Sequence, residues 1–415
     1  MTTTRIRAAI PAVAIAALAL VAPAARATPP RIQAPSGIVI EASTGDVTYA
    51  KQPDQKRAIA STTKLMTALL ALEAGGLHDL VPAASYHPAP AESQIHLQPG
   101  EKLTEADLLR GLLVYSANDA AETIAEHVAG SEAAFVRRMN RRAQQIGLKN
   151  THYANPIGLD APGNYSTARD LVTLTQSLRK YRFFRRTVNS ASVTLRSGHV
   201  IRTLANRNTL LGQATWIDGV KTGHTTQAGD VLVASASKRG VRLISAVLGE
   251  PDRSQRNADS LALLNYAFTK YVRVRAIARG DTVAKVPIAH RTGAVLPLVA
   301  SRTVHEVKHL KERFGYRTIG VPAKVDGPIH YGERIGTVEV LRHGKRIASV
   351  PLTAGLEVPA ASAARKTQDF LTTPWTLAVL GVLLLLVALV ASRRRPPPGD
   401  ERPSRRSAPE EAPAP

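Results

Sequence analysis

The sequence predicts an α+β protein that continues into a smaller β-rich region and ends with an apolar segment and a polar tail. Between about Pro35 and Val274, strand-like segments alternate with apolar helical patterns, which favours an antiparallel sheet with helices packed around it. From Arg275 to Pro359 helical periodicity is scarce and strand-like runs dominate. The uncharged run from Trp375 to Ala391 is 17 residues long, the lower limit for a membrane span.

The elements of the first region can be placed in chain order. Helical patterns cover Thr104 to Tyr115, Ala120 to Ile146 and Asp170 to Leu178, because their apolar residues recur with helical spacing. Further along, Trp216 to Thr225 precedes the β-rich run Val231 to Ser237. We expect the former to be an edge strand that borders a cleft, because its glycine permits close approach of a ligand backbone.

The second region, residues 275–359, contains two strand-like runs, Ile335 to Leu341 and Ile347 to Leu352. The intervening His343-Gly344-Lys345 favours a turn, so the two runs predict a hairpin. Residues 360–373 are then interpreted as a stalk or linking helix before the apolar segment, residues 374–391.

The two ends of the chain predict its topology. Residues 1–27 have a basic start, an apolar stretch and the small-x-small pattern Ala25-Arg26-Ala27, which is typical of a secretory signal removed near Thr28; an uncleaved anchor is the alternative. Arginines from Arg393 to Arg395 directly follow the apolar run, and arginine marks the cytoplasmic side of a span. The main domain should therefore lie outside the membrane, and the tail, residues 392–415, inside with a disordered composition. A buried core helix is the alternative for the run.

Composition excludes several classes of protein. The net charge of +22 suits an anionic surface such as wall polymers or lipid headgroups, although general arginine richness explains it equally well. An aromatic content of 4% offers few stacking platforms for nucleic acid, and the export signal also argues against that partner. The chain has no cysteine, and its 12 histidines show no zinc-binding spacing, so we expect no disulfide, metal or other cofactor.

Ser61 and Lys64 are the first candidate catalytic pair. They stand three residues apart at the start of the apolar helical run that continues to Glu73, which places both side chains on one helix face. A neutral lysine there could accept the serine proton, and burial or a second cation would favour that neutral form. Taken alone, Ser-x-x-Lys fits an ordinary helix N-cap followed by an exposed lysine.

Two further motifs follow downstream. Ser116 and Asn118 come after an apolar stretch; the serine could relay a proton toward a leaving amine, and the amide can both donate to and accept from a peptide. Lys221 and Thr222 in Lys221-Thr222-Gly223-His224 offer a cation and a hydroxyl to a substrate carboxylate. Each motif alone also fits a structural role, a second N-cap or a strand end with a turn glycine. The ordered set of three indicates acyl-enzyme chemistry.

These motifs resemble those of the serine D-alanyl-D-alanine carboxypeptidases, the low-molecular-mass penicillin-binding proteins, in which Ser-x-x-Lys, a Ser-x-Asn motif and Lys-Thr-Gly occur in this order. The resemblance runs from about Ala34 to Ala354 and includes Glu41-Ala42-Ser43-Thr44-Gly45, Asn118-Asp119-Ala120-Ala121-Glu122, Gly158-Leu159-Asp160 and Tyr165-Ser166-Thr167-Ala168-Arg169-Asp170. It implies a β-lactamase/transpeptidase-like catalytic domain over residues 35–274, followed by the small β-rich domain of these enzymes.

The resemblance also implies roles for individual residues. Ser61 would be the nucleophile and Lys64 its base, with Ser116 and Asn118 as second-motif partners. Lys221, Thr222 and Gly223 would orient the substrate, and the oxyanion would meet backbone N–H groups of Ser61 and His224. A guanidinium for the terminal carboxylate is assigned to Arg256, although Arg253 stands nearby.

The reaction that the resemblance implies is removal of the terminal D-alanine from peptidoglycan stem peptides at the bacterial cell membrane, with β-lactams acylating the same serine. Three alternatives remain at this point: a β-lactamase, a D,D-endopeptidase that cuts cross-links, and a catalytically silent wall-binding protein. The second β-rich region and the predicted span argue against the β-lactamase, and the intact motifs argue against the silent protein.

Overall fold

The computed structural model describes residues 27–393. The predicted signal sequence before Ala27 and the tail from Arg394 onward lie outside the described residues. The chain forms two compact units: the first runs to Val274 and includes Glu306–Glu312, and the second comprises Arg275–His305 and the chain from Arg313.

The first unit is built on one antiparallel sheet of five strands in the order β2-β1-β9-β8-β7. These strands are Val47–Lys51, Ser36–Glu41, Val241–Glu250, Gly229–Lys238 and Ile217–Thr225. The predicted edge strand is confirmed, because β7 pairs only with β8 within this sheet of the described chain. β7 is therefore an edge strand of this sheet.

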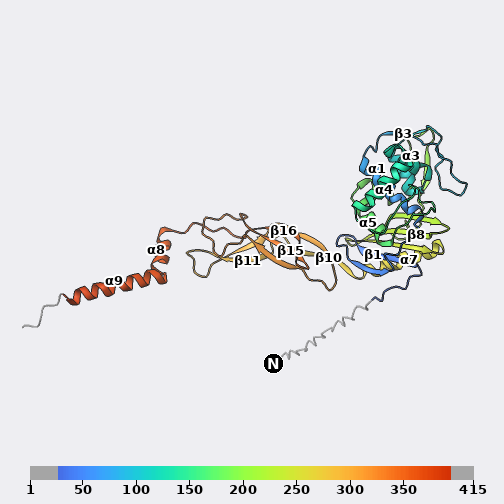
Figure 1. Cartoon of the computed structure of the whole chain (residues 1–415). Coiled ribbons are helices and arrows are strands. Elements are labelled where there is room, and N and C mark those ends of the chain that lie inside the picture. Colours follow the sequence, from blue (N-terminus) through green and yellow to red (C-terminus); the bar gives the residue numbers. More distant parts are fainter. Residues whose placement is uncertain (1–26, 394–415) are drawn as a thin grey trace, which may run out of the picture. The chain divides into compact units, whose positions relative to one another are not determined.

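Alternate side chains along the strands point to opposite faces of the sheet and pack into two separate hydrophobic cores. Val39, Leu232 and Val247 pack toward α7 (Arg253–Phe268) on one face, whereas Ile38, Val233 and Ala246 belong to the larger core on the other face. This is the period-two pattern of a strand buried on both sides. In Figure 1, α7 lies below β8, and α5, α4 and α1 lie above it. The predicted antiparallel sheet with surrounding helices is thus observed.

The helices over the larger core are short and follow one another closely. They are α1 (Lys64–Ala74), α2 (Glu105–Arg110), α3 (Asn118–Ala129), α4 (Glu132–Gln145), α5 (Ala168–Leu178) and α6 (Arg182–Val188). The single helical pattern predicted from Ala120 to Ile146 is divided in two. Gly130 ends α3 with a φ of 78°, a left-handed conformation that suits glycine, and the Ser131 side chain caps α4.

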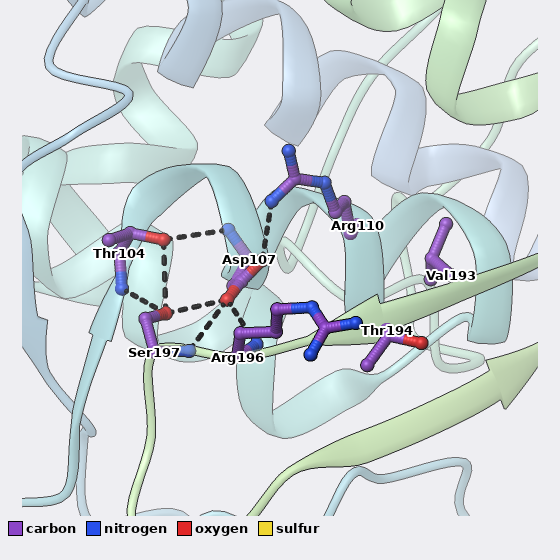
Figure 2. A pocket seen from close by; sticks show the side chains of 7 residues that line it. All are labelled: Thr104, Asp107, Arg110, Val193, Thr194, Arg196 and Ser197. Carbon is purple, nitrogen blue, oxygen red and sulfur yellow. Dashed lines mark hydrogen bonds and ion pairs between the residues drawn. The ribbon is translucent and has the colours of Figure 1, made fainter.

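Two small hairpins lie beside these helices: β3 (Leu80–Pro82) with β4 (Lys102–Thr104), and β5 (Ser192–Leu195) with β6 (Arg202–Ala205). The Asp107 carboxylate of α2 binds the loop of the second hairpin. It accepts hydrogen bonds from the backbone N–H groups of Arg196 and Ser197 at 2.9 and 3.0 Å and from the Ser197 hydroxyl. Figure 2 shows these hydrogen bonds in a pocket of about 510 Å³. The hairpin is thereby fixed to the helix that leads into the Ser116 motif.

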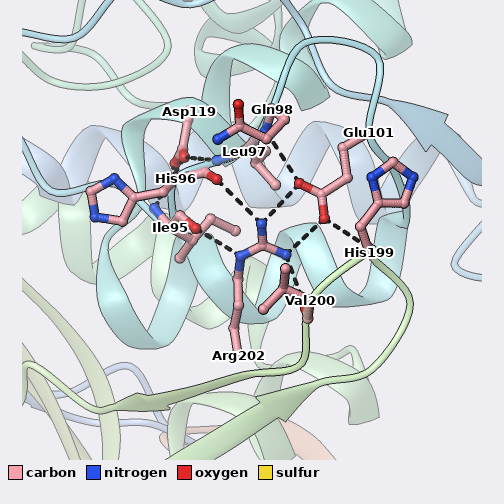
Figure 3. Close-up of polar contacts among 9 residues, drawn as sticks. All are labelled: Ile95, His96, Leu97, Gln98, Glu101, Asp119, His199, Val200 and Arg202. Atoms are coloured by element: carbon pink, nitrogen blue, oxygen red, sulfur yellow. Dashed lines mark hydrogen bonds and ion pairs between the residues drawn. The ribbon is translucent and has the colours of Figure 1, made fainter.

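Arg202 of β6 links the same hairpin to the loop between β3 and β4 by hydrogen bonds. Its guanidinium donates to both Glu101 carboxylate oxygens at 2.8 Å and to the carbonyl oxygens of Ile95 and His96 (Figure 3). The Glu101 side chain is fully buried. Hydrogen bonds from Arg202, aided by backbone N–H groups and opposed by burial, lower the pKa of Glu101 to about 2.

Replacement of Arg202 by methionine is expected to lower the free energy of unfolding by about 3 kcal/mol at pH 7, because it leaves the buried Glu101 charge without its partner. The folded-state pKa of Glu101 lies below its unfolded value, so the stability it contributes is present above about pH 4.5 and is lost as the pH falls toward 2. Urea unfolding at pH 7 and pH 3 should therefore show a smaller difference from wild type at the acid pH. The exposed Arg196, replaced in the same way, serves as the control; equal effects of the two changes would contradict the prediction.

The second unit holds a five-stranded antiparallel sheet in the order β11-β12-β16-β15-β14. The strands are Thr282–Pro287, Val295–Ala300, Lys345–Ala354, Arg334–Arg342 and Gly315–Ile319. His343 and Gly344 form the two-residue turn between β15 and β16, both with positive φ, which is the geometry of a tight hairpin. The hairpin predicted at this place is therefore confirmed. A further ladder joins β10 (Tyr271–Ile277) and β13 (Val304–His309).

Two helices end the described chain, α8 (Ala363–Thr372) and α9 (Pro374–Arg393). The second is 20 residues long with a mean hydropathy of 2.6, and none of its apolar window is buried. By length and composition it can cross a membrane. The alternative of a buried core helix does not fit, because its leucines and valines are exposed.

Candidate active site

Ser61 lies in a 3₁₀ turn, Ala60–Thr63, immediately before α1, and Lys64 is the first residue of that helix. The prediction placed both residues at the helix start, and the observed turn keeps their side chains together. Lys64 Nζ donates a hydrogen bond of 3.0 Å to Ser61 Oγ. Ala60 has a φ of 46°, a costly conformation for a residue with a Cβ, which turns the chain sharply just before the serine.

Lys64 is fully buried. Besides Ser61, its ammonium donates to Asn118 Oδ1 at 2.6 Å and to the carbonyl oxygen of Ile157 at 2.5 Å. Burial lowers the pKa of Lys64 to about 7, although the charges of Glu92 and Asp119 act in the opposite direction. A large fraction of this lysine is therefore neutral near pH 7, and a neutral amine that kept its bonds to Asn118 and Ile157 would have a lone pair available for the serine hydroxyl.

Ser116 and Lys221 form a second hydroxyl and amine pair. Lys221 Nζ, carried by β7, donates to Ser116 Oγ at 2.9 Å and to the Thr222 carbonyl oxygen at 2.8 Å. Ser116 has a left-handed φ of 72° between the π-helical turn Gly111–Tyr115 and α3, so it is not the N-cap of α3, a position that Ala117 occupies. Burial, together with the positive charges of Lys64, Arg207 and Arg256, lowers the pKa of Lys221 well below its ordinary value.

Two glycines allow the walls of the site to approach the Ser61 turn. A Cβ on Gly158 would lie 2.1 Å from the Ala60 carbonyl oxygen, and its φ of 89° also disfavours a side chain. A Cβ on Gly223 would lie 3.0 Å from the Ser61 backbone nitrogen and 2.9 Å from Ala60 Cβ. The edge strand β7 thus passes directly beside the serine turn, which explains the glycine in the Lys-Thr-Gly motif.

The remaining predicted residues lie at the far end of β7 or beneath it. Thr222 is buried, whereas the His224 ring is 67% exposed and hydrogen bonds to Asp230 Oδ2 on the neighbouring strand. Arg256 of α7 is 2% exposed and donates to Asp230 Oδ1 at 3.0 Å. The charge of Arg256 is therefore paired with Asp230 of β8, the same carboxylate that binds the His224 ring of β7.

The structure adds three side chains that the sequence motifs did not reveal. Glu92 accepts from Asn118 Nδ2 at 2.6 Å and from the Tyr86 hydroxyl. Arg207, two residues after the end of β6, is exposed and stacks over the Tyr115 ring at 4.2 Å. No short motif marks these residues, because their contacts depend on loops that are distant in sequence.

The arrangement is suited to acyl transfer. Two serine hydroxyls each accept a hydrogen bond from a buried lysine of lowered pKa, and one of them lies beside an open strand edge that can bind an extended peptide. Among residues 27–393, no group of three or more His, Asp and Glu side chains could hold a metal ion.

Comparison with known proteins agrees with this geometry. Residues 23–252 match peptidase family S11, described as D-alanyl-D-alanine carboxypeptidase. The chain belongs to this family. The D-alanyl-D-alanine carboxypeptidase DacF of Bacillus subtilis is 34% identical over 330 residues, which cover 78% of this chain and 85% of DacF. DacA of Escherichia coli is 33% identical over 363 residues, covering 82% of this chain and 88% of DacA.

A solved structure extends the family resemblance beyond the matched residues. Penicillin binding protein 5 from Haemophilus influenzae superimposes with a TM-score of 0.59 at 32% identity, and the match covers 80% of this chain and 99% of that one. This D-alanyl-D-alanine carboxypeptidase family member is therefore a serine carboxypeptidase with a mixed α and β fold like that of the penicillin-binding proteins.

Proposed function

We propose that this carboxypeptidase removes the terminal D-alanine from peptidoglycan stem peptides through an acyl-enzyme on Ser61. The observation that carries the proposal is the hydrogen bond between Ser61 and the buried Lys64, whose pKa of about 7 makes a neutral amine available as a base. Such a base activates a serine hydroxyl that is a weak nucleophile by itself.

Acylation then proceeds in two steps. Neutral Lys64 takes the Ser61 proton as Oγ forms a bond to the carbonyl carbon of the penultimate D-alanine, and the carbonyl oxygen becomes an oxyanion stabilised by the Ser61 and His224 backbone N–H groups. The carbon–nitrogen bond then breaks. The proton that Lys64 accepted passes by way of Ser116, which Lys221 holds, to the nitrogen of the departing D-alanine, so Lys64 is neutral again. Lys64 then takes a proton from a water molecule that attacks the ester carbonyl, and the same proton returns to Ser61 Oγ as the ester bond breaks and the shortened peptide leaves.

Substrate orientation follows from the open edge of β7. An extended stem peptide can pair with this strand while its amide groups meet Asn118, and the Thr222 hydroxyl faces the terminal carboxylate. Of the two arginines near the site, Arg256 is paired with Asp230, so we assign charge recognition of the carboxylate to the exposed Arg207 and a supporting role to Arg256. β-Lactams would acylate Ser61 at the same place.

The domain assignments complete the proposal. A signal sequence over residues 1–27 exports the catalytic domain, residues 35–274, and the small β-rich domain, residues 275–359, follows it. A stalk, residues 360–373, leads to a membrane span, residues 374–391, that anchors the enzyme in the bacterial cell membrane with its tail inside. The exposed apolar helix α9 and the arginine at its end support this orientation.

The test is release of D-alanine from diacetyl-Lys-D-Ala-D-Ala by the mature protein in detergent, alongside covalent labelling with a fluorescent penicillin. We expect D-alanine release and a label that maps to the peptide containing Ser61. Rapid turnover of the penicillin would instead indicate a β-lactamase. Penicillin labelling combined with cleavage of a cross-linked peptide dimer, but without release of D-alanine, would indicate an endopeptidase, and absence of labelling would contradict the proposal altogether.

A further inference from the structure

Asn118 has an amide that is hydrogen bonded on both sides. Its Oδ1 accepts from Lys64 Nζ at 2.6 Å, and its Nδ2 donates to Glu92 Oε2 at 2.6 Å. Rotating the amide by half a turn would point its N–H groups at the lysine and its oxygen at the carboxylate, which would break both bonds and place like charges together. The carboxylate of Glu92 thus determines which end of Asn118 faces the catalytic lysine.

Glu92 is itself held firmly. The Tyr86 hydroxyl donates to Oε2, and the Ala89 backbone N–H donates to Oε1 at 2.9 Å. Burial opposes ionisation of this half-buried acid, but the hydrogen bonds from Tyr86, Asn118 and Ala89 outweigh it and keep the pKa of Glu92 below its ordinary value. The carboxylate is therefore negatively charged at neutral pH.

The loop that carries Glu92 is anchored from two directions. Asp119 at the start of α3 accepts from the backbone N–H groups of Ile95 and Leu97 at 3.0 to 3.1 Å. Arg202 binds the Ile95 and His96 carbonyl oxygens and Glu101 from the other side, as Figure 3 shows. Glu92 is thus carried by a loop whose following segment is bound both to α3, through Asp119, and to the β5–β6 hairpin, through Arg202.

We infer that Glu92 is a positioning residue of this active site, which orients the Asn118 amide toward Lys64 and adds a fixed negative charge near that lysine. The inference rests on the proposed function, because it assigns Lys64 as the base. The charged groups that act on Lys64 come from two elements, Glu92 from the loop and Asp119 from α3, and Lys64 in turn acts on Lys221 of β7. Glu122 of α3 acts on the Tyr86 hydroxyl that binds Glu92.

The sign of the effect on acylation follows from these charges. A negative Glu92 favours the protonated form of Lys64 and so raises the pKa of this lysine. Replacing Glu92 by glutamine keeps an acceptor for Tyr86 and Asn118 but removes the charge. The acylation rate is measured with a fluorescent penicillin between pH 5 and pH 9. Its acid limb, the part of the profile in which the rate rises as Lys64 loses its proton, should then move to lower pH by about 1 unit.

A second variant tests the orientation of Asn118. Replacing Glu92 by alanine removes both the charge and the acceptor, so the amide is free to rotate. We expect the same shift of the acid limb together with a fall of at least about tenfold in the rate constant on the pH plateau, since small displacements of catalytic groups are costly. Replacement of Glu126 by glutamine, on the exposed side of α3, is the matched control and should leave the profile unchanged.

The outcomes separate this inference from the function on which it rests. If penicillin labels the wild type, and both Glu92 variants are labelled at wild-type rates with an unmoved acid limb, the inference is overturned. The carboxypeptidase assignment then remains intact. Wild-type protein that penicillin does not label would overturn both. A lowered melting temperature of the alanine variant without any shift of the limb in either variant would reduce Glu92 to a structural role and would also overturn the inference.

Discussion

Replacement of Ser61 by alanine is expected to abolish D-alanine release and covalent penicillin labelling together, with a fall in rate of at least about 10⁴-fold. Both reactions need the same oxygen atom, the one that accepts the hydrogen bond from Lys64. Because the Ser61 side chain is only half-buried and the change removes a single oxygen atom, the variant should fold normally. The measurement is D-alanine release from diacetyl-Lys-D-Ala-D-Ala, with mass spectrometry of the penicillin adduct.

The matched control for this change is Ser43→Ala, a serine in the first unit whose hydroxyl donates to the Glu41 carboxylate and not to a residue of the catalytic motifs. It should retain wild-type labelling. A Ser61→Ala protein that still forms a stable penicillin adduct would show that another residue is the nucleophile, and Ser116 would be the first alternative to examine.

Replacement of Lys64 by methionine is expected to lower the acylation rate by about 10³-fold and to remove its dependence on pH near neutrality. General-base catalysis contributes factors of about 10²–10⁴. In the wild type the base works as a neutral amine with a pKa of about 7, so acylation should increase as the pH rises through 7 and then level off. Without the amine, this increase should vanish. The measurement is the rate of penicillin acylation between pH 5 and pH 9.

Lys149→Met provides the comparison, because this lysine is exposed on the surface of the same unit. Its profile should match that of the wild type. If Lys64→Met kept the increase through pH 7, the titrating base would be a different group, and Lys221, the second buried amine bound to a serine, would be the candidate.

Features that depend on residues close in sequence were predictable. The three-residue spacing of Ser61 and Lys64 brings their side chains together whether the turn is 3₁₀ or α-helical, and the observed hydrogen bond agrees. The hairpin at His343-Gly344 was likewise predictable from turn chemistry. The division of the helical pattern at Gly130 was missed, because apolar spacing continues across the break and hides the glycine and the Ser131 cap.

The charge partners of the site were not predictable in the same way. The role of Arg256 at the substrate carboxylate stays a prediction, but the sequence did not indicate that the fold brings Asp230 to its guanidinium at 3.0 Å. Nothing in the sequence near Asn118 signals that Glu92, on a separate loop, binds its amide. Such partners come together only when strands and loops that are tens of residues apart pack against each other.

The pattern of residues close in sequence was therefore sufficient to predict the α+β class, the apolar C-terminal helix, the edge strand and the catalytic motifs. Hydrophobic periodicity and motif spacing depend only on residues that are near one another in the chain. Tertiary structure decided that Ser116 meets Lys221, that burial lowers the pKa of both lysines, and that two acids oppose this effect at Lys64. The physical reason is that desolvation and Coulomb interactions depend on distance in space, which the sequence alone does not contain.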